Sequence, residues 1–187
     1  SVSRDFVELP SQINEHWAME PEVLKAYAKH YETGEVIPDA LIEKINRQST
    51  FNEGFITTEL LAASILDMEL HNLTEIKDFD ILDFEKVAMD KVGLIPEIAP
   101  RYRSTYFNHI IGGYAAGYYS YSWANVLDND AFEAFKENGI FDQKTARLFR
   151  TQILEKGGSD DPMTLYVNFR GAEPKLDAML RNRGLIH

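Results

Sequence analysis

Apolar residues recur every three or four positions along most of the chain, which is the spacing of one face of an α-helix. The longest such segment runs from Phe51 to Leu73, and Thr57 or Thr58 is a candidate for its N-cap. Shorter segments of the same kind follow: Asp83 to Val92, Asn129 to Glu137 and Lys175 to Arg183. A glycine stands within two residues of the end of each shorter segment, where helices typically stop.

Two aspartates stand where further helices are expected to begin. Asp142 is a candidate N-cap for a segment that continues to Leu154 and ends before Gly157. Asp161 precedes Pro162, a residue type favoured in the first turn of a helix. Few stretches alternate apolar and polar residues for long enough to form strands. The pattern therefore predicts a single all-α domain with short connections.

The composition narrows the classes of function. The 187 residues include 19 Lys and Arg against 30 Asp and Glu, which gives a formal net charge of −11. This balance argues against binding to nucleic acid, which needs clustered basic side chains. Cysteine is absent, so disulfides, thiolate metal ligands and cysteine nucleophiles are excluded. No run approaches the ~20 apolar residues that cross a bilayer, so we expect no membrane insertion.

Residues 4–17 predict an amphipathic segment near the start of the chain. If the segment is helical, four polar residues share one face: Glu8, Ser11, Gln12 and Glu15. Glu8 could then be a metal ligand, with Gln12 or Glu15 as its hydrogen-bonding support. The alternative is that Asp5 and Glu8 form a capping box at the helix start, and the spacing alone favours the capping box.

A second candidate site lies between residues 109 and 123. The segment combines an imidazole, a glycine pair and several phenols: His109, Gly112, Gly113, Tyr114, Tyr118 and Tyr121. The three tyrosines have the i, i+4, i+7 spacing of one helix face, whereas Ile110 and Ile111 could be extended. Phenols beside an imidazole are neutral hydrogen-bond donors that can stabilise a developing oxyanion. The alternative, which spacing alone favours, is that the tyrosines belong to the core.

The remaining histidines do not show the spacing of a metal site: His16, His30, His71 and His187. The first three are predicted to lie at the surface or at helix ends, and His187 is the last residue of the chain.

Several short segments occur in the order typical of one enzyme family. They include Arg-Asp-Phe-Val-Glu at 4–8, His-Tyr-Glu-Thr-Gly at 30–34, Phe-Asn-Glu-Gly-Phe at 51–55, His-Ile-Ile-Gly-Gly-Tyr at 109–114 and Tyr-Tyr-Ser-Tyr-Ser-Trp at 118–123. With these segments the chain resembles the thimet oligopeptidase family of zinc metallopeptidases, and most of all its bacterial peptidyl-dipeptidase branch. The resemblance covers essentially all 187 residues and implies the helical C-terminal half of a zincin-type catalytic domain.

The resemblance implies a zinc ligand in the first matching segment. In that family the Glu of Arg-Asp-Phe-Val-Glu is the third protein ligand of the catalytic zinc, and it corresponds to Glu8. The first two ligands are histidines of a His-Glu-x-x-His helix, whose Glu activates the zinc-bound water. Gln12 and Glu15 are our candidates for residues that support Glu8.

The resemblance also implies roles for the glycine- and tyrosine-rich segment. His109 corresponds to a histidine on a loop over the cleft, and Gly112, Gly113 and Tyr114 are our candidates for substrate binding. Tyr118 and Tyr121 correspond to tyrosines expected to contact the scissile carbonyl and the transition state.

The chain departs from the family pattern in ways that bear on activity. It contains no His-Glu-x-x-His, Asn125 replaces a usual acidic residue, and Ala172 replaces a common basic one. It also begins at Ser1 with neither an initiator Met nor a signal sequence. We therefore expect a piece of a longer protein, inactive and without catalytic zinc on its own.

The expected full-length protein cleaves short peptides, releases C-terminal dipeptides and resides in the cytoplasm, as the family does. Its missing N-terminal part would be the main partner of this chain. Without that part the chain should expose a large apolar surface and dimerise. A non-catalytic helical module that binds peptides is the alternative function.

Overall fold

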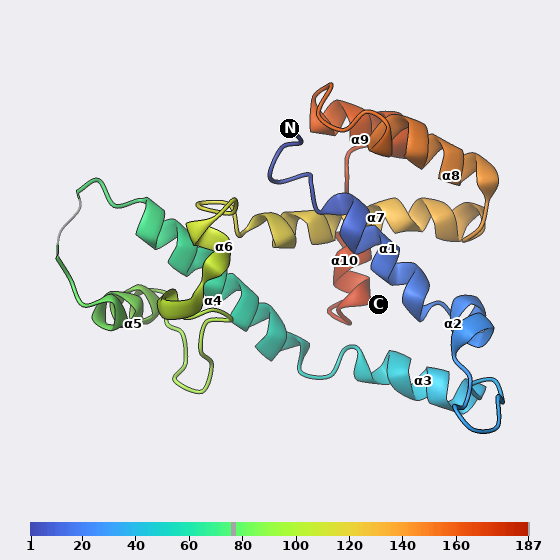
Figure 1. Cartoon of the computed structure of the whole chain (residues 1–187), viewed down its shortest axis with the longest axis horizontal. Coiled ribbons are helices and arrows are strands. Elements are labelled where there is room, and N and C mark those ends of the chain that lie inside the picture. The colour runs from blue at the N-terminus through green and yellow to red at the C-terminus, as the bar shows by residue number, and fades with distance from the viewer. Residues whose placement is uncertain (76–77, 187) are drawn as a thin grey trace. The chain divides into compact units, whose positions relative to one another are not determined.

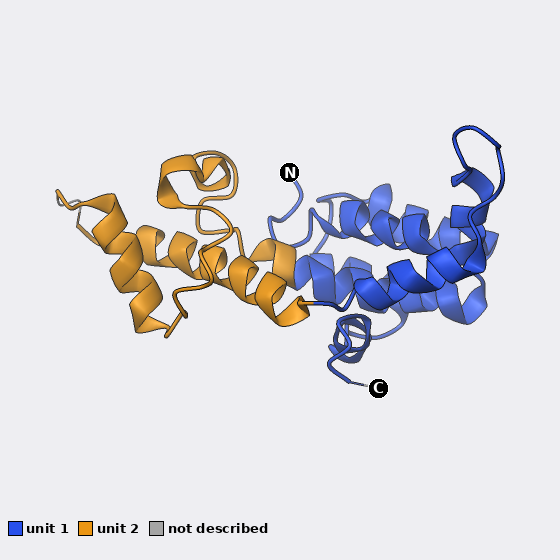
Figure 2. Ribbon diagram, turned by 90° about the horizontal axis from the view of Figure 1, so that it is seen from below, with its two compact units in different colours: residues 1–51, 123–187 blue, residues 52–122 orange. Residues whose placement is uncertain are grey.

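The computed structural model describes residues 1–75 and 78–186. Its contacts divide the chain into two compact units, which Figure 2 distinguishes by colour. Unit 1 comprises residues 1–51 and 123–187, and unit 2 comprises residues 52–122. No β-strand occurs in the described part of the chain, where an isolated bridge between Lys29 and Val36 is the nearest approach to one. The predicted all-α fold class is confirmed, and His187 lies outside the described residues.

Unit 1 is built from short helices and most of one long helix (Figure 1). The elements are α1 Leu9–Met19, α2 Pro21–Tyr27, α3 Asp39–Gln48, α7 Ser120–Asn138, α8 Gln143–Phe149, the π-helical turn η2 Arg150–Leu154, α9 Pro162–Arg170 and α10 Asp177–Asn182. The helix α7 begins at Ser120, nine residues before the segment expected from residue 129 onward, and most of its residues belong to unit 1.

The core of unit 1 fixes α1 against α7. Leu9 and Ile13 of α1 are fully buried in one cluster with Phe132 and Phe135 of α7. The Trp17 ring meets the rings of both phenylalanines edge-on, at centroid distances of 4.7 and 4.6 Å. Its indole N–H donates to the carbonyl of Ile140 at 2.8 Å. Edge-on aromatic contacts stabilise the packing beyond the burial of apolar area. The apolar face of α1 therefore fixes the position of this helix on α7.

The two helix starts expected from aspartates are confirmed. The Asp142 carboxylate accepts the Thr145 N–H at 2.7 Å and its hydroxyl at 2.8 Å, and these bonds hold the pKa of Asp142 below its usual value. The Asp161 carboxylate accepts the Thr164 N–H at 2.9 Å. Both side chains satisfy backbone donors that the first turn of a helix leaves unpaired.

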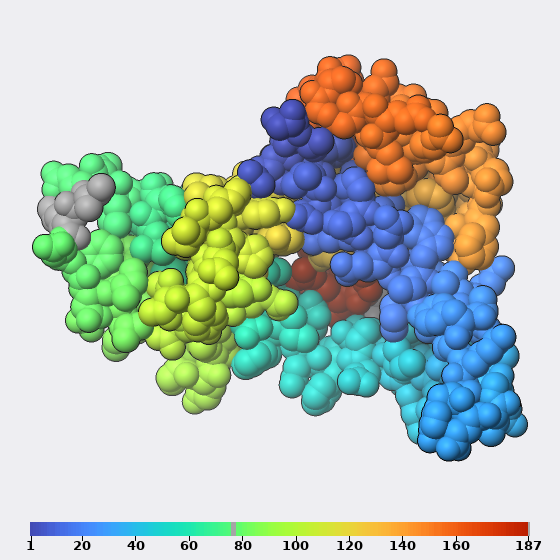
Figure 3. All heavy atoms as spheres, viewed as in Figure 1, coloured from blue at the N-terminus to red at the C-terminus, as the bar shows by residue number. Residues whose placement is uncertain are grey.

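The N-terminal residues pack onto the segment that follows η2. A Cβ on Gly158 would lie 2.1 Å from the carbonyl oxygen of Ser1, so only glycine fits there. The dark-blue and orange spheres of these two segments adjoin in Figure 3. Val2 continues this contact by packing against the core of unit 1.

The described part of unit 2 contains two long helices and a later segment with two short helical turns that leads to α7. Its elements are α4 Glu53–His71, α5 Ile81–Lys91, the 3₁₀ turn η1 Ser104–Tyr106 and α6 Asn108–Ile111. The expected N-cap of the first helix is wrong, because α4 begins four residues earlier than Thr57, after Asn52 in the left-handed region at φ 57°. Ile110 and Ile111 are also helical rather than extended, because they form the end of α6.

Two small clusters of buried residues meet along α4. Ala62 and Leu66 pack with α5, whereas Ala63 packs with Phe107 and Tyr118 from the later segment. The buried Glu85 of α5 binds that later segment as well, accepting the N–H and hydroxyl of Ser104 at 2.9 and 3.0 Å. Unit 2 therefore holds its irregular segment against both of its helices.

Candidate functional site

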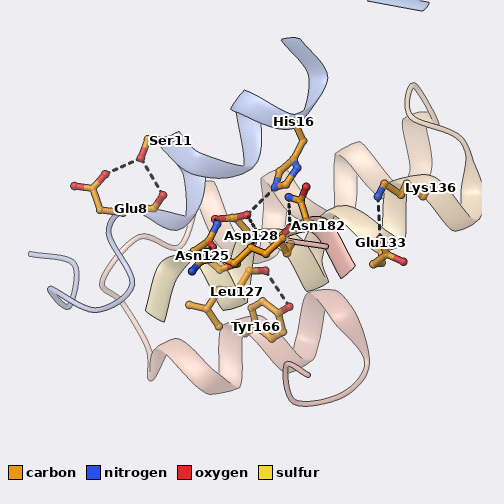
Figure 4. Close-up of polar contacts among 12 residues, drawn as sticks. Glu8, Ser11, His16, Asn125, Leu127, Asp128, Glu133, Lys136, Tyr166 and Asn182 are labelled. Carbon is orange, nitrogen blue, oxygen red and sulfur yellow. Dashed lines mark hydrogen bonds and ion pairs between the residues drawn. The ribbon is translucent and has the colours of Figure 1, made fainter. Parts of the chain in front are cut away.

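Glu8 stands at the N-cap position of α1. Its side chain makes no capping bond to the backbone of the helix. Instead, its carboxylate accepts the Ser11 hydroxyl at 2.7 Å, as Figure 4 shows. The capping box expected from Asp5 and Glu8 is therefore wrong, because the helix begins only at Leu9. The side chain is partly exposed at the helix start, and the Ser11 bond fixes the direction of one carboxylate oxygen.

The residues expected to support Glu8 lie further along α1. Gln12 donates its backbone N–H to the Glu8 carbonyl at 3.0 Å, and Glu15 is exposed. Both side chains line a hollow of about 640 Å³ in unit 1, together with His16 and Asp128. Their support of Glu8 stays a prediction.

His16 lies in the last turn of α1, as the helix-end prediction has it, but its imidazole is partly buried and has a defined partner. Its Nε2 lies 2.6 Å from the carboxylate of Asp128, whose side chain is 1% exposed (Figure 4). The imidazole stacks on Phe132 at a centroid distance of 4.8 Å and an angle of 12°. Burial raises the pKa of Asp128, and the hydrogen bond and charge of His16 act in the opposite direction. The pair therefore ties the last turn of α1 to α7 by a largely buried polar contact.

Asparagines surround this ion pair. Asn125 and Asn129 donate to Asp128 at 3.3 and 2.9 Å, so the buried carboxylate has donors besides His16. Asn182 of α10 donates to Asn129 at 2.6 Å, and Arg183 donates to Asn125 at 2.7 Å. Asn125, which departs from the family pattern, thus has a defined place in a network that joins α7 and α10.

The expected helix face of tyrosines does not form. Residues 112–119 are a series of turns, and α7 begins only at Ser120. Ala116 lies in the left-handed region at φ 52°, which a regular right-handed helix does not contain. Tyr114 and Tyr118 therefore project from a loop, and only Tyr121 projects from a helix.

The loop nevertheless brings the aromatic side chains together. The imidazole of His109 lies 5.9, 5.1 and 5.9 Å from the rings of Tyr114, Tyr118 and Tyr121, measured between centroids. Tyr114 stacks on Tyr121 at 5.2 Å, and Tyr118 meets Tyr121 edge-on at 5.2 Å. We call these four residues the tyrosine cluster. An oxyanion-binding site needs hydrogen-bond donors that are held close together before the reaction, and this cluster holds phenols and an imidazole close together.

The tyrosine cluster has a buried side and an accessible side. Tyr118 is 2% exposed and packs with Phe107 in one buried cluster, and its role in the site stays a prediction. Tyr114 and Tyr121 are only partly buried. Burial raises the pKa of Tyr118 to about 12, against a smaller effect of Arg101, so its phenol is uncharged at neutral pH. His109 keeps a buried Nδ1 that has no partner among the described residues.

Sequence reasoning missed the residue that holds the loop. Asp67 of α4 is fully buried and accepts backbone N–H groups of residues 116 and 118. Its signal in the sequence is weak, because Asp67 and Glu69 both interrupt a largely apolar part of the predicted helix and the pattern does not tell which of them is buried.

The described residues do not form a complete metal site. Among residues 1–75 and 78–186, no three His, Asp or Glu side chains are placed so that they could hold one ion. Glu8 lies in unit 1 and the tyrosine cluster in unit 2. A protein zinc site needs three or four ligands, so the described residues do not by themselves offer a full set for zinc.

Among the described residues, no helix has both the length and the apolar character that crossing a membrane requires.

Comparison with known proteins gives matches along almost the whole chain. The family described as Peptidase family M3 matches residues 1–185. Dipeptidyl carboxypeptidase of Salmonella typhimurium is 48% identical over 188 residues, which are 99% of this chain and 28% of that protein. Oligopeptidase A of Haemophilus influenzae is 42% identical over 188 residues, 100% of this chain and 28% of that protein. Saccharolysin of Saccharomyces cerevisiae is 32% identical over 189 residues, 99% of this chain and 26% of that protein.

Each match covers nearly all of this chain but only a small part of the relative. The chain spans little more than a quarter of the length of these curated relatives. The expected resemblance is confirmed, including its dipeptidyl carboxypeptidase branch.

Replacing His16 should destabilise unit 1. We expect His16→Ala to lower the free energy of unfolding by about 3 kcal/mol, because a buried carboxylate loses its main partner while two asparagines still donate to it. Urea denaturation followed by the fluorescence of Trp17 and Trp123, which both belong to unit 1, measures this change. The control His16→Gln keeps an N–H donor and should lose less. Equal losses in both variants, or a loss below about 0.5 kcal/mol in His16→Ala, would contradict the role of the pair.

Tyr118 should stay protonated in moderate alkali. Because its pKa is raised to about 12, the wild type and Tyr118→Phe should gain the same phenolate absorbance up to about pH 11. An ultraviolet titration of both proteins measures this. A deficit of about half a phenolate in the variant already near pH 10 would show that the phenol is solvated and has the ordinary pKa of about 10.

Proposed function

Because the chain belongs to peptidase family M3, we propose that the full-length protein is a zinc-dependent metallopeptidase that hydrolyses short peptides. The family match over residues 1–185 carries the proposal, and relatives named as dipeptidyl carboxypeptidase and oligopeptidase A support it. The geometry of Glu8 is compatible with it, since the carboxylate is not used to cap its own helix.

In this proposal Glu8 is one protein ligand of the zinc. A His-Glu-x-x-His helix outside this chain supplies the other two ligands and the general base. Zinc, when bound, lowers the pKa of its water and polarises the scissile carbonyl. Glu8 approaches the ion from the start of α1, and the Ser11 hydroxyl orients its carboxylate by a bond of 2.7 Å. On this assignment the chain alone holds no catalytic zinc and is inactive.

The buried contacts of α1 fix the position of that ligand. Ile13 and Trp17 pack on α7, and the bond from His16 to Asp128 holds the helix two turns after Glu8. Metal sites depend on ligands that are held in place before the ion binds, so these contacts serve the site although they do not touch it.

The tyrosine cluster acts on the substrate in this proposal. Tyr118 and Tyr121 donate hydrogen bonds to the scissile carbonyl oxygen as it acquires negative charge, and His109 supports the same charge. A phenol that stays protonated can donate throughout the reaction, which the raised pKa of Tyr118 favours. Gly112, Gly113 and Tyr114 bind the peptide backbone, because glycines allow close approach.

We assign the release of C-terminal dipeptides to the enzyme, since the match with dipeptidyl carboxypeptidase of Salmonella typhimurium is 48% identical and that with oligopeptidase A is 42% identical. The main partner of the chain is the remainder of the same protein, and the location is the cytoplasm. The remainder should cover apolar side chains such as Phe51 and Ile111, which are 70% and 84% exposed here. Dimerisation of the isolated chain through such residues stays a prediction.

The alternative is a helical module that binds peptides with the tyrosine cluster and does not cleave them. The two functions differ in the sequence before this chain. A His-Glu-x-x-His about 25 residues before Glu8 supports the peptidase, and its absence from the full-length protein supports the binding module.

Variants of the full-length protein test the proposed roles. Glu8→Gln should lower zinc affinity by more than the roughly 10–100-fold that loss of a supporting residue costs. Tyr121→Phe should keep its zinc and lower kcat about 10²–10³-fold at similar KM, because it removes a donor used in the transition state.

Zinc content by mass spectrometry after dialysis against a chelator, and hydrolysis of a tetrapeptide, measure the two effects. The control Glu22→Gln on the exposed face of α2 should change neither. Wild-type zinc affinity in Glu8→Gln, or wild-type turnover in Tyr121→Phe, would refute the corresponding role.

A further inference from the structure

Asp67 is a charged residue in a place where charge is unfavourable. It lies on α4 within the run from Ala62 to Leu70, and none of its surface is exposed. Neighbouring Leu66 is equally buried. A buried carboxylate costs several kcal/mol unless hydrogen bonds replace its water, so its contacts identify what it stabilises.

Those contacts are made mainly with the loop of residues 112–119. One carboxylate oxygen of Asp67 accepts the N–H of Ala116 at 2.9 Å, and the other accepts the N–H of Tyr118 at 2.9 Å. His71, one turn later on α4, lies with its Nδ1 2.8 Å from the first oxygen. Bonds from N–H groups to a carboxylate are stronger than bonds between neutral groups.

The loop needs such a contact because part of its backbone is unfavourable. Ala116 has φ 52°, a left-handed conformation that costs free energy for any residue with a Cβ. The loop's own bonds are isolated turns, such as Gly117 N–H to the Tyr114 carbonyl at 2.9 Å. One bond to Asp67 is made by the N–H of the strained Ala116 itself, and the other by the N–H of Tyr118 two residues later. Together they fix the backbone before and after the Cα of Ala116.

The same bonds decide where the tyrosines lie. Tyr118 donates its own backbone N–H to Asp67, and its ring contacts His109 and Tyr121. Tyr114 precedes the strained residue by two positions and reaches the cluster from the other end of the turn. A change in φ at Ala116 would therefore separate Tyr114 from Tyr118.

We propose that Asp67 is a positioning residue of the tyrosine cluster: by binding the N–H groups of Ala116 and Tyr118, its buried carboxylate holds the loop in the conformation that gathers the phenols around His109. The catalytic consequence rests on the proposed function, whereas the structural consequence does not. Asp67 itself does not touch the substrate.

Hydrogen exchange of the full-length protein tests the structural part. In Asp67→Asn one loop N–H faces an amide donor instead of an acceptor. We expect peptides covering residues 112–119 to exchange about tenfold faster or more, the effect of losing a bond to a charged group. Unchanged exchange in this segment would overturn the proposal.

A matched control separates this effect from general destabilisation. Asp130 is also a buried carboxylate, and it accepts the Tyr166 hydroxyl at 2.7 Å in unit 1. Asp130→Asn should leave exchange of residues 112–119 unchanged. An equal increase in Asp130→Asn would mean that the loop reports only overall stability, which would overturn the proposal.

The wild type provides a second measurement if Asp67→Asn does not fold. Residue-resolved exchange should show the amides of Ala116 and Tyr118 protected to a similar degree, because one carboxylate holds both. Exchange of either amide at the rate of an unfolded chain would overturn the proposal.

Kinetics of Asp67→Asn test the catalytic consequence. Displaced phenols should lower kcat about tenfold to a hundredfold at nearly constant KM. Faster loop exchange with unchanged kcat would overturn the positioning role in catalysis and leave the loop contact in place. A wild-type protein that hydrolyses no peptide would instead refute the proposed function, and the exchange experiment would still decide the structural part.

Discussion

The buried carboxylate of Asp67 is the contact on which the arrangement of unit 2 depends. The loop of residues 112–119 lacks the regular backbone bonds of a helix and contains a strained alanine. Its conformation must therefore be determined by bonds from elsewhere, and Asp67 supplies two. The tyrosine cluster depends on this contact, because its rings converge only when the loop has this conformation.

Buried carboxylates have a similar role elsewhere in the chain. Glu85 accepts two donors from Ser104 and so binds the segment before α6 to α5. Asp128 binds His16 and so fixes α1 in unit 1. A buried charge tolerates few arrangements of its neighbours, because every lost bond leaves it unsatisfied. Such groups define one geometry more strictly than apolar packing does, which suits the positioning of a catalytic residue.

The parts of the fold that sequence could predict are those with local causes. The aspartates at 142 and 161 cap helices three residues or fewer from the donors they accept, so local composition was sufficient. Thr57 failed as an N-cap because the start of α4 is set by a left-handed asparagine five residues earlier. The second boundary between the two units had no local signal, since it falls inside α7, whereas the first lies in the connection between α3 and α4.

In the candidate site, too, the sequence could predict which residues matter but not the contacts that place them. Local spacing singled out the tyrosines, and the family resemblance singled out Glu8. Periodicity gave the tyrosines the wrong local structure, because Asp67, about 50 residues away, stabilises a turn where the pattern favours a helix. The partner of His16 was likewise missed, because Asp128 lies 112 residues further along the chain. Contacts at such separations leave no pattern in one sequence.

The central claim is the pair of proposed roles in the full-length protein: Glu8 binds the zinc, and Tyr121 donates a hydrogen bond to the substrate. A crystal structure of that protein with zinc and a phosphinic peptide, which imitates the tetrahedral transition state, tests it most directly. The account predicts the Glu8 carboxylate on the zinc and the phenol oxygen of Tyr121 within about 3 Å of a phosphinate oxygen. A zinc ion bound without Glu8, or phenols turned away from the phosphinate, would contradict it.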